Sequence, residues 1–242
     1  MKKRIISLLM VFCMILSLFP VGVFAAGEQK RITAAKPAPS TLSKPTDTKA
    51  QTSTKPANPF ADVKENDWFY NDVAYAYENG LMNGTSATTF APYANTTRGM
   101  IVTILWRMDG QTAPLHDCQF ADVADGSYYE LAIAWAAENG IVNGFSATEF
   151  KPDANITREQ FAAIMYRYAQ YKGYDVSVGE NTNILSYGDA ETVSAYAVPA
   201  MQWACGAGLV NGIDGNLVPA GNATRAQAAA ILHRFCETLE LL

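Results

Sequence analysis

Apolar residues recur at helical spacing in three separate segments of the chain. The repeated stripes follow the i, i+3, i+4, i+7 pattern of an amphipathic helix. They comprise Ile101, Ile104, Leu105 and Met108; Phe161, Ile164, Met165 and Tyr168; and Ala228, Ile231, Leu232 and Phe235. A shorter apolar stretch precedes each stripe and stops at a glycine, which is typical of a helix C-terminus. The pattern therefore predicts three helix–loop–helix units and an all-α fold.

The three units are copies of one sequence. The copy that starts at Phe60 aligns without a gap with the copy that starts at Phe120, and a more divergent copy starts at Tyr187. One such helix pair has no core of its own, so the copies should fold together. We expect a pseudo-threefold bundle around the three second helices, with units at residues 60–118, 119–172 and 173–242.

Signals for the ends of the helices recur in each copy. The first helices should end at Gly80, Gly140 and Gly208, and Thr97, Thr157 and Thr224 should cap the second helices. Gln160 and Gln227 complete capping boxes, whereas copy one has Met100 there. The connecting loop holds a second Asn-Gly, ending at Gly84, Gly144 and Gly212, whose glycine suits a positive φ angle. Pro199 falls in the opening turn of the first helix of copy three.

The N-terminal part of the chain has a different composition. Residues 1–26 combine three cations, an apolar run and a small-x-small site, which predicts a secretory signal peptide. Residues 27–59 are rich in Thr, Lys, Pro, Ala and Ser, which predicts a disordered linker. We therefore expect a secreted protein with no stable membrane span once the signal is cleaved.

Charge and cysteine content exclude several functions. From residue 60 onward the chain has nine Lys/Arg against 21 Asp/Glu, a net charge of −12, which disfavours nucleic acid as a partner. Cys118, Cys205 and Cys236 match no metal-binding spacing; Cys205 and Cys236 could pair, or all three could be free thiols. No sequence feature predicts a cofactor, a metal site or a catalytic centre.

The few cations recur at fixed places. Arg98, Arg158 and Arg225 directly follow the capping threonines, and Arg107, Arg167 and Arg234 come nine residues later. The later set should lie near the helix C-termini, where the helix dipole favours cations. The early set should lie at the helix N-termini, where the helix dipole disfavours cations. Either an internal carboxylate or a bound anion should offset this electrostatic cost. The residues alone do not choose between these two.

Two further residue types recur with the early arginines. Asp62, Asp122 and Asp189 lie near the start of each copy, and an aromatic side chain precedes each first helix at Trp68, Tyr128 and Tyr196. Aromatic faces pack on sugar rings, but they also pack on each other, and core packing is the more common role for any one of these rings. Arginine, aromatic and acid together, three times over, fit a binder of an acidic saccharide better than a catalyst.

These motifs resemble the S-layer homology (SLH) domain. The resemblance rests on F-x-D-V, on N-G-[IL]-[VM]-N-G and on the T-R helix start, and it covers essentially the whole region from Phe60 onward. Copy one departs from the pattern with Gly99 and Met100 after its arginine. Copy three departs with Tyr196 in place of Trp and with Pro199, so its groove could be altered.

The family resemblance implies a function and a set of site residues. Three SLH repeats anchor proteins non-covalently to secondary cell-wall polysaccharide of Gram-positive-type bacteria, often through a pyruvylated amino sugar held between repeats. Transferred to this chain, the ligand-binding residues would be Arg98, Arg158, Arg225, Asp62, Asp122, Asp189, Trp68, Tyr128 and Tyr196.

Two other functions compete with anchoring. In a structural or assembly module of a surface layer, the arginines would only bridge repeats and the partners would be other surface-layer proteins. An enzyme is disfavoured, because the folded region has only His116 and His233 and no recognisable catalytic motif.

Overall fold

The computed structural model describes residues 58–239, and they are helical. The expected signal peptide and nearly all of the expected linker lie outside the described residues. Within residues 58–239 there are six α-helices, three short 3₁₀ helices and isolated β-bridges, and no helix is long and apolar enough to span a bilayer. The expectation of an all-α fold is confirmed.

Each copy contributes two α-helices. Copy one has α1 (Tyr70–Glu78) and α2 (Arg98–Met108), and copy two has α3 (Glu130–Glu138) and α4 (Arg158–Tyr171). Copy three has α5 (Val198–Gly206) and α6 (Arg225–Thr238). Three 3₁₀ turns precede α5: η1 (Ser177–Asn181), η2 (Ala190–Thr192) and η3 (Ala195–Ala197).

The helix ends follow the sequence signals. Each expected threonine caps its helix by accepting a hydrogen bond from the third backbone N–H, and α4 and α6 have complete capping boxes while α2 has none. Gly80, Gly140 and Gly208 follow the first helices with φ angles of 66°, 69° and 72°. Here local backbone chemistry alone fixes the helix boundaries.

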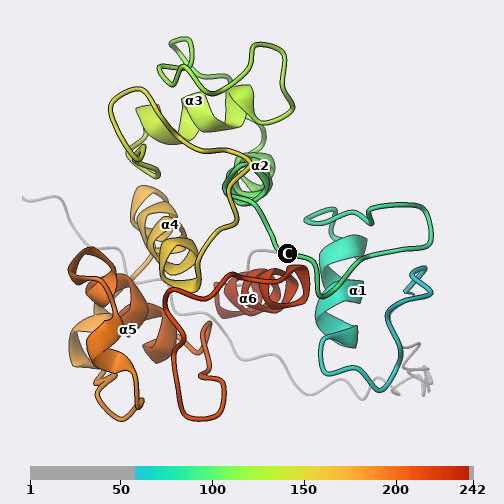
Figure 1. Ribbon diagram of the computed structural model, residues 1–242, viewed down its shortest axis with the longest axis vertical. Helices are drawn as coiled ribbons and strands as arrows, with labels where there is room; N and C mark the ends of the chain where they lie inside the picture. The colour runs from blue at the N-terminus through green and yellow to red at the C-terminus, as the bar shows by residue number, and fades with distance from the viewer. Residues whose placement is uncertain (1–57, 240–242) are drawn as a thin grey trace, which may run out of the picture. The chain divides into compact units, whose positions relative to one another are not determined.

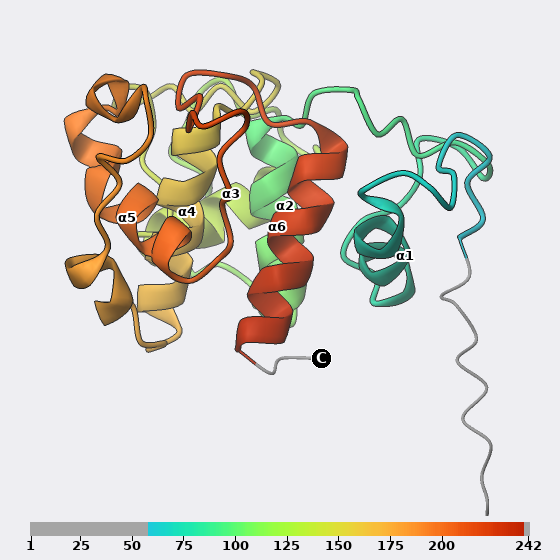
Figure 2. The same ribbon diagram turned by 90° about the horizontal axis from the view of Figure 1, so that it is seen from below.

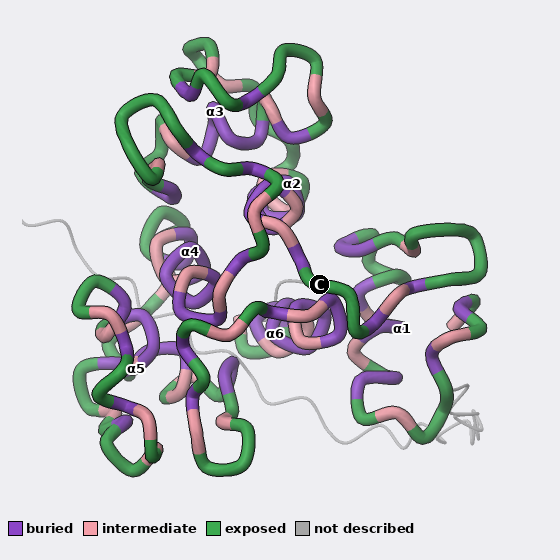
Figure 3. The backbone as a smooth tube through the Cα atoms, in the orientation of Figure 1, coloured by how far each residue is buried: buried purple, intermediate pink, exposed green. Residues whose placement is uncertain are grey.

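Helices pair between neighbouring copies rather than within a copy. α3 packs on α2, α5 packs on α4, and α1 packs on α6, so each first helix covers the second helix of the preceding copy. α2, α4 and α6 therefore lie on the inside and α1, α3 and α5 on the outside (Figure 1, and turned by 90° in Figure 2). The stripes on the inner helices are buried mainly in these pairings (Figure 3).

A closed ring of backbone hydrogen bonds links the three copies where the chain enters the second helices. Thr96 N donates to Ala223 O, Ala223 N donates to Ile156 O, and Ile156 N donates to Thr96 O, each at 2.9 Å. Antiparallel β-bridges flank the ring between each copy and the next. Each copy therefore donates one of these backbone hydrogen bonds to one neighbour and accepts one from the other. This is the pseudo-threefold relation that the repeats predicted.

The α1–α6 pairing joins the two ends of the repeat array. His233 Nδ1 lies 2.8 Å from Asp72 Oδ1, and the His233 ring stacks on Tyr75 with 3.9 Å between ring centroids. Trp106 and Tyr166 occupy the position of His233 in the other two copies. Polar contacts thus supplement packing at the interface that closes the array.

A carboxylate at the start of each copy organises the loop before the second helix. Asp62 accepts hydrogen bonds from the backbone N–H groups of Phe90 and Ala91, and Asp122 and Asp189 repeat this pattern. The second residue of each clamped pair has a positive φ angle: 58° at Ala91, 60° at Lys151 and 51° at Val218. Such angles are strained for non-glycine residues, so the aspartates offset a local cost.

The glycine of the second Asn-Gly has a different role from the one expected. Gly84, Gly144 and Gly212 are absent from the positive-φ residues, so the φ prediction is wrong for all three. Instead, a Cβ atom at Gly144 would lie 2.3 Å from Ser146 O and 2.5 Å from the ring of Phe120. The loop needs glycine because the first aromatic residue of the copy packs directly against its backbone.

The three cysteines within residues 58–239 are free thiols, so no disulfide links Cys205 to Cys236. Burial raises the pKa of the Cys236 thiol to about 11, which makes it an unreactive core side chain. No group of three or more His, Cys, Asp or Glu in this part of the chain could hold a metal ion.

We expect Asp62→Asn to lower the free energy of unfolding at pH 7 by about 1–2 kcal/mol, because the carboxylate accepts two backbone hydrogen bonds. Burial alone would raise the pKa of Asp62, but these bonds outweigh it and hold the pKa below 3.8. A depressed pKa stabilises the fold above the ordinary value, and this stabilisation is lost as the pH falls through the lowered pKa.

Urea unfolding between pH 2.5 and 7 measures both effects. The stability gap between wild type and Asp62→Asn should narrow below about pH 4, where the carboxylates of the unfolded and then the folded chain become protonated. Asp125→Asn is the control, because Asp125 is exposed. A gap that is constant across this range would contradict the clamp.

Candidate functional site

The N-terminal ends of α2, α4 and α6 are occupied by the neighbouring copy. Arg98 N donates to Ala154 O at 3.0 Å and Gly99 N donates to Pro152 O at 2.8 Å, and α4 and α6 repeat both contacts. The capping threonine takes the third N–H. The first three N–H groups of each of these helices therefore already have protein acceptors, because the loop of the next copy crosses each helix start.

The early arginines reach into the same loops. Arg98 Nε donates to Phe150 O at 3.0 Å, and its Nη2 donates to Asn143 O at 3.3 Å. Arg158 makes the equivalent bonds to Leu217 O and Asn211 O, and Arg225 to Phe90 O and Asn83 O. Within residues 58–239 no carboxylate lies within 4 Å of these guanidinium groups, and Nη1 donates no hydrogen bond to the protein.

Carbonyl groups and aromatic faces thus offset the cost of a cation at a helix start. The three side chains are only 5%, 5% and 8% exposed. Burial lowers the pKa of Arg98 to about 10 and lowers the pKa values of Arg158 and Arg225, yet each stays protonated near neutral pH. The guanidinium carbons of Arg98 and Arg225 also lie 4.5 Å from the ring centroids of Phe150 and Phe90.

An open groove lies beside each early arginine, and we name the grooves A, B and C. Groove A has a volume of about 370 Å³ and is lined by Arg98, Val142, Asn143, Gly144, Phe145, Gln160, Ala163, Ile164, Arg167 and Tyr196. Groove B has about 420 Å³ and is lined by Trp68, Arg158, Leu209, Val210, Asn211, Gly212, Ile213, Asp214, Gln227, Ala230, Ile231 and Arg234. Groove C has about 240 Å³ and is lined by Leu81, Met82, Asn83, Thr96, Met100, Thr103, Ile104, Arg107, Tyr128 and Arg225.

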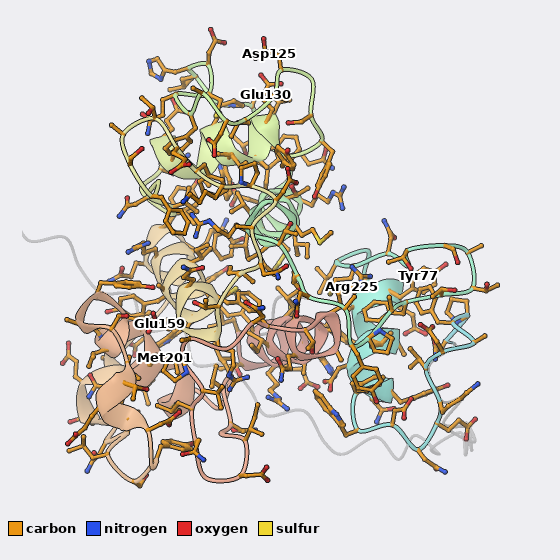
Figure 4. All side chains as sticks on the ribbon, viewed as in Figure 1. Tyr77, Asp125, Glu130, Glu159, Met201 and Arg225 are labelled. Carbon is orange, nitrogen blue, oxygen red and sulfur yellow. The ribbon has the colours of Figure 1, made fainter. Side chains whose placement is uncertain are left out.

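Every groove is built from all three copies. Groove A takes its early arginine from copy one, its loop and helix from copy two and Tyr196 from copy three, and grooves B and C follow the same rotation. Figure 4 shows Arg225 at the end of α6 that faces copy one, and its Nη2 reaches Asn83 O there at 2.7 Å. No single copy could form a groove.

The later arginines also line the grooves, opposite the early ones. Arg107 lies in the last turn of α2, but α4 and α6 continue past Arg167 and Arg234 to Tyr171 and Thr238. The expectation that all three would lie at helix C-termini is therefore wrong for the last two. Their side chains are half-buried or exposed. We call them the rim arginines.

The aromatic residues that precede the first helices stand at the groove edges. Trp68, Tyr128 and Tyr196 are 60%, 56% and 52% exposed, and each lines a groove whose other walls come from the other two copies. They are not core side chains. Each ring keeps a face open to a ligand.

A buried glutamate holds one of these rings. Glu159 accepts hydrogen bonds from Ser194 N at 3.0 Å, Ser194 Oγ at 2.8 Å and Tyr196 Oη at 3.3 Å, and Figure 4 shows it between α4 and α5. Burial, together with Glu159, raises the pKa of Tyr196 to about 12. Copy one has Gly99 at the position of Glu159, where a Cβ atom would lie 2.9 Å from the ring of Tyr129.

Asp62, Asp122 and Asp189 do not line any of the three grooves. They hold the turns whose carbonyl groups accept hydrogen bonds from the early arginines, so they support the grooves without lining them.

Sequence reasoning missed the rim arginines, Gln160, Gln227 and Phe145 as groove residues. Their recurrence in register was visible, but which groove they face depends on how the copies pack.

One buried hydroxyl group lacks a partner in groove C. Thr96 is fully buried, and its Oγ1 has no hydrogen-bond partner within the described part of the chain. Ile156 and Ala223 occupy the equivalent positions. An unpaired buried hydroxyl group is costly to the fold.

Comparison with known proteins identifies the repeats. The S-layer homology domain family matches residues 59–99, 119–162 and 186–229. The chain is 33% identical to an endoglucanase of Bacillus sp. (strain KSM-635) over 95% of its own length and 22% of the enzyme. It is 35% identical to the surface-layer 125 kDa protein of Lysinibacillus sphaericus over 45% of this chain and 10% of that protein.

A third relative is a cellulosome-anchoring protein of Acetivibrio thermocellus, 23% identical over 65% of this chain and 35% of that protein. The chain spans about a tenth to a third of the length of these relatives. Three matched segments, one in each copy, together cover more than half of the chain. The chain belongs to the S-layer homology domain family.

Proposed function

We propose that this chain anchors itself to a bacterial cell wall by binding an anionic secondary cell-wall polysaccharide in grooves A, B and C. The charged group is a carboxylate such as ketal-linked pyruvate on an amino sugar. The chain is a cell-surface, cell-wall-associated protein of a Gram-positive-type bacterium. Relatives named as a surface-layer protein and a cellulosome-anchoring protein support the anchoring role.

One observation carries the proposal: in a region with a net charge of −12, six of the nine cations line the three grooves in pairs. Each pair combines a buried early arginine with a rim arginine from the next copy. The buried arginine is fixed by carbonyl groups, and its Nη1 has no protein partner among residues 58–239. A carboxylate that lies between the fixed guanidinium group of the buried arginine and that of the rim arginine would make charge-assisted hydrogen bonds.

The exposed ring at each groove edge suits the rest of the ligand. Pyranose rings stack on aromatic faces, and Trp68, Tyr128 and Tyr196 each present one. Grooves of about 240–420 Å³ hold one or two sugar units rather than a long chain. Three such grooves on one polymer would also add avidity.

A structural or assembly role remains the second candidate, because the early arginines do bridge the copies. Their bonds to carbonyl groups of the next copy explain their burial without any ligand. The rim arginines separate the two functions, since Arg107 and Arg167 make no hydrogen bond to the protein within residues 58–239. Catalysis forms no part of the proposal, because the chain corresponds to 22% or less of the length of the related glycan-cleaving enzymes.

We expect the triple variant Arg107→Ala, Arg167→Ala, Arg234→Ala to lose at least tenfold in binding to native wall sacculi. Each groove would lose one charge-assisted contact. Co-sedimentation with sacculi measures this, and Lys64→Ala is the control because Lys64 is an exposed cation outside the grooves. Equal retention of the triple variant and wild type would contradict a site in the grooves.

Stability separates the two sets of arginines. Arg158→Ala should lower the free energy of unfolding by about 1–3 kcal/mol, because it leaves the buried Leu217 carbonyl without its donor. Arg167→Ala should change it by less than about 0.5 kcal/mol. Thermal unfolding of the two variants checks this. A loss of stability in Arg167→Ala as large as in Arg158→Ala would favour the purely structural role.

Mild acid removes ketal-linked pyruvate from wall polymers and leaves most of the polymer in place. We expect acid-treated sacculi to bind the chain at least tenfold more weakly than untreated sacculi. Sham-treated sacculi, taken through the same steps at neutral pH, control for other damage. Undiminished binding after complete removal of pyruvate would rule out this carboxylate as the recognised group.

A further inference from the structure

The three grooves share one plan but differ in the surroundings of the early arginine. In groove A the guanidinium carbon of Arg98 lies 4.8 Å from the ring centroid of Phe145 and 4.5 Å from that of Phe150. In groove B the corresponding residues near Arg158 are Ile213 and Leu217, which are aliphatic. The cation of groove A is therefore held between two aromatic faces, and that of groove B is not.

The loop of copy three also brings a carboxylate to groove B. This loop is one residue shorter than the loops of copies one and two. It closes in a tight turn in which Ile213 and Asn216 exchange backbone hydrogen bonds of 2.7 and 2.9 Å, and Asp214 and Gly215 have φ angles of 48° and 78°. The turn places Asp214 in the lining of groove B, where grooves A and C have no acid.

Asp214 is exposed, and within the described residues its carboxylate makes no hydrogen bond or ion pair. No protein cation in the described part of the chain therefore neutralises this charge at the edge of groove B. Near groove A, Lys151 Nζ lies 4.7 Å from the ring centroid of Phe145, but it pairs with Glu149 at 3.4 Å, so this pair adds no net charge. The lining of groove A thus has two arginines and no acid, whereas that of groove B has two arginines and Asp214, and groove A favours an anion more strongly.

We propose that the grooves are not equivalent: groove A is the main site for the acidic sugar, and Asp214 makes groove B disfavour a carboxylate. This inference rests on the proposed function and adds which groove binds the charged sugar unit. Groove B still holds two arginines and Trp68, so it accepts an uncharged sugar of the same polymer with little penalty. Two loop residues, Phe145 and Asp214, set the difference.

The size of the effect follows from exposure. Two like charges that are both largely in water change a binding constant by about two- to fivefold. Asp214→Asn removes the charge and keeps the shape of the turn, because the φ angle of 48° suits Asn as well as Asp. The variant should therefore restore anion binding in groove B without altering groove A.

NMR titration of the ¹⁵N-labelled chain reads the grooves separately. The backbone amide signals of Gly144 and Gly212 report on grooves A and B, because these glycines line them. The backbone amide signal of Asn83, which lines groove C, reports on that groove. The probe is the methyl glycoside of an N-acetylated amino sugar that carries ketal-linked pyruvate. Its methyl ester is the uncharged control ligand.

For wild type and the acid probe, we expect the Kd fitted to the Gly144 chemical shifts to be at least threefold lower than the Kd fitted to the Gly212 shifts. Asp214→Asn should lower the Kd from Gly212 two- to fivefold for the acid, leave it unchanged for the ester, and leave Gly144 unchanged for both. Asp125→Asn is the matched control, with the same charge change outside the grooves. Asp125 belongs to copy two and lines none of the three grooves, and Figure 4 shows it near Glu130 at the start of α3.

Equal Kd values at Gly144 and Gly212 in wild type, or no effect of Asp214→Asn at Gly212, would overturn the inequivalence while leaving glycan binding in place. Equal affinity for the acid and its ester at every groove would overturn the charge recognition on which both proposals rest. So would the absence of any shift at all three reporters.

Discussion

The closed ring of three backbone hydrogen bonds between Thr96, Ile156 and Ala223 is the constraint on which the rest of the structure depends. It sets each copy against both neighbours at the point where the second helices begin. The first two N–H groups of each helix then meet carbonyl groups of the next copy, and the arginine side chain follows them into the same loop. Fixing the ring therefore fixes where every groove opens.

This arrangement gives the early arginines two roles at once. Nε and Nη2 tie one copy to the next, and the same side chain lines a groove. A buried cation held by neutral carbonyl groups keeps its full charge, whereas a carboxylate partner would have neutralised it. The acidic character of the domain elsewhere makes these grooves its concentrated sites of positive charge.

The sequence predicted the elements well and the site only in part. Caps, capping boxes and C-terminal glycines were readable, because they depend on residues within a few positions of each other. The exchange of helix partners between copies, the rim arginines in the grooves and the role of Gly144 depend on contacts between segments far apart in the chain. The early arginines were singled out as unusual, but of the two expected partners the internal carboxylate is absent within residues 58–239, where carbonyl groups of the next copy accept instead.

Comparing the copies also shows where the repeats have diverged. The structural residues of the ring, the caps and the aspartate clamp recur with small changes, whereas the groove residues differ in charge and aromatic character. The loop after the first helix is one place where the copies differ, at Phe145 and Asp214. Changes in this loop can alter ligand preference while the ring, the caps and the aspartate clamp stay in place.

Chemical protection of the arginines tests the central claim most directly. The chain is labelled with butanedione, with and without saturating wall polysaccharide, and each modified arginine is quantified by mass spectrometry. The account predicts that Arg107, Arg167 and Arg234 react in the free chain and become at least fivefold slower when the glycan is bound, while the buried Arg98, Arg158 and Arg225 react slowly in both states. Unchanged labelling of the rim arginines in the presence of bound polysaccharide would contradict it.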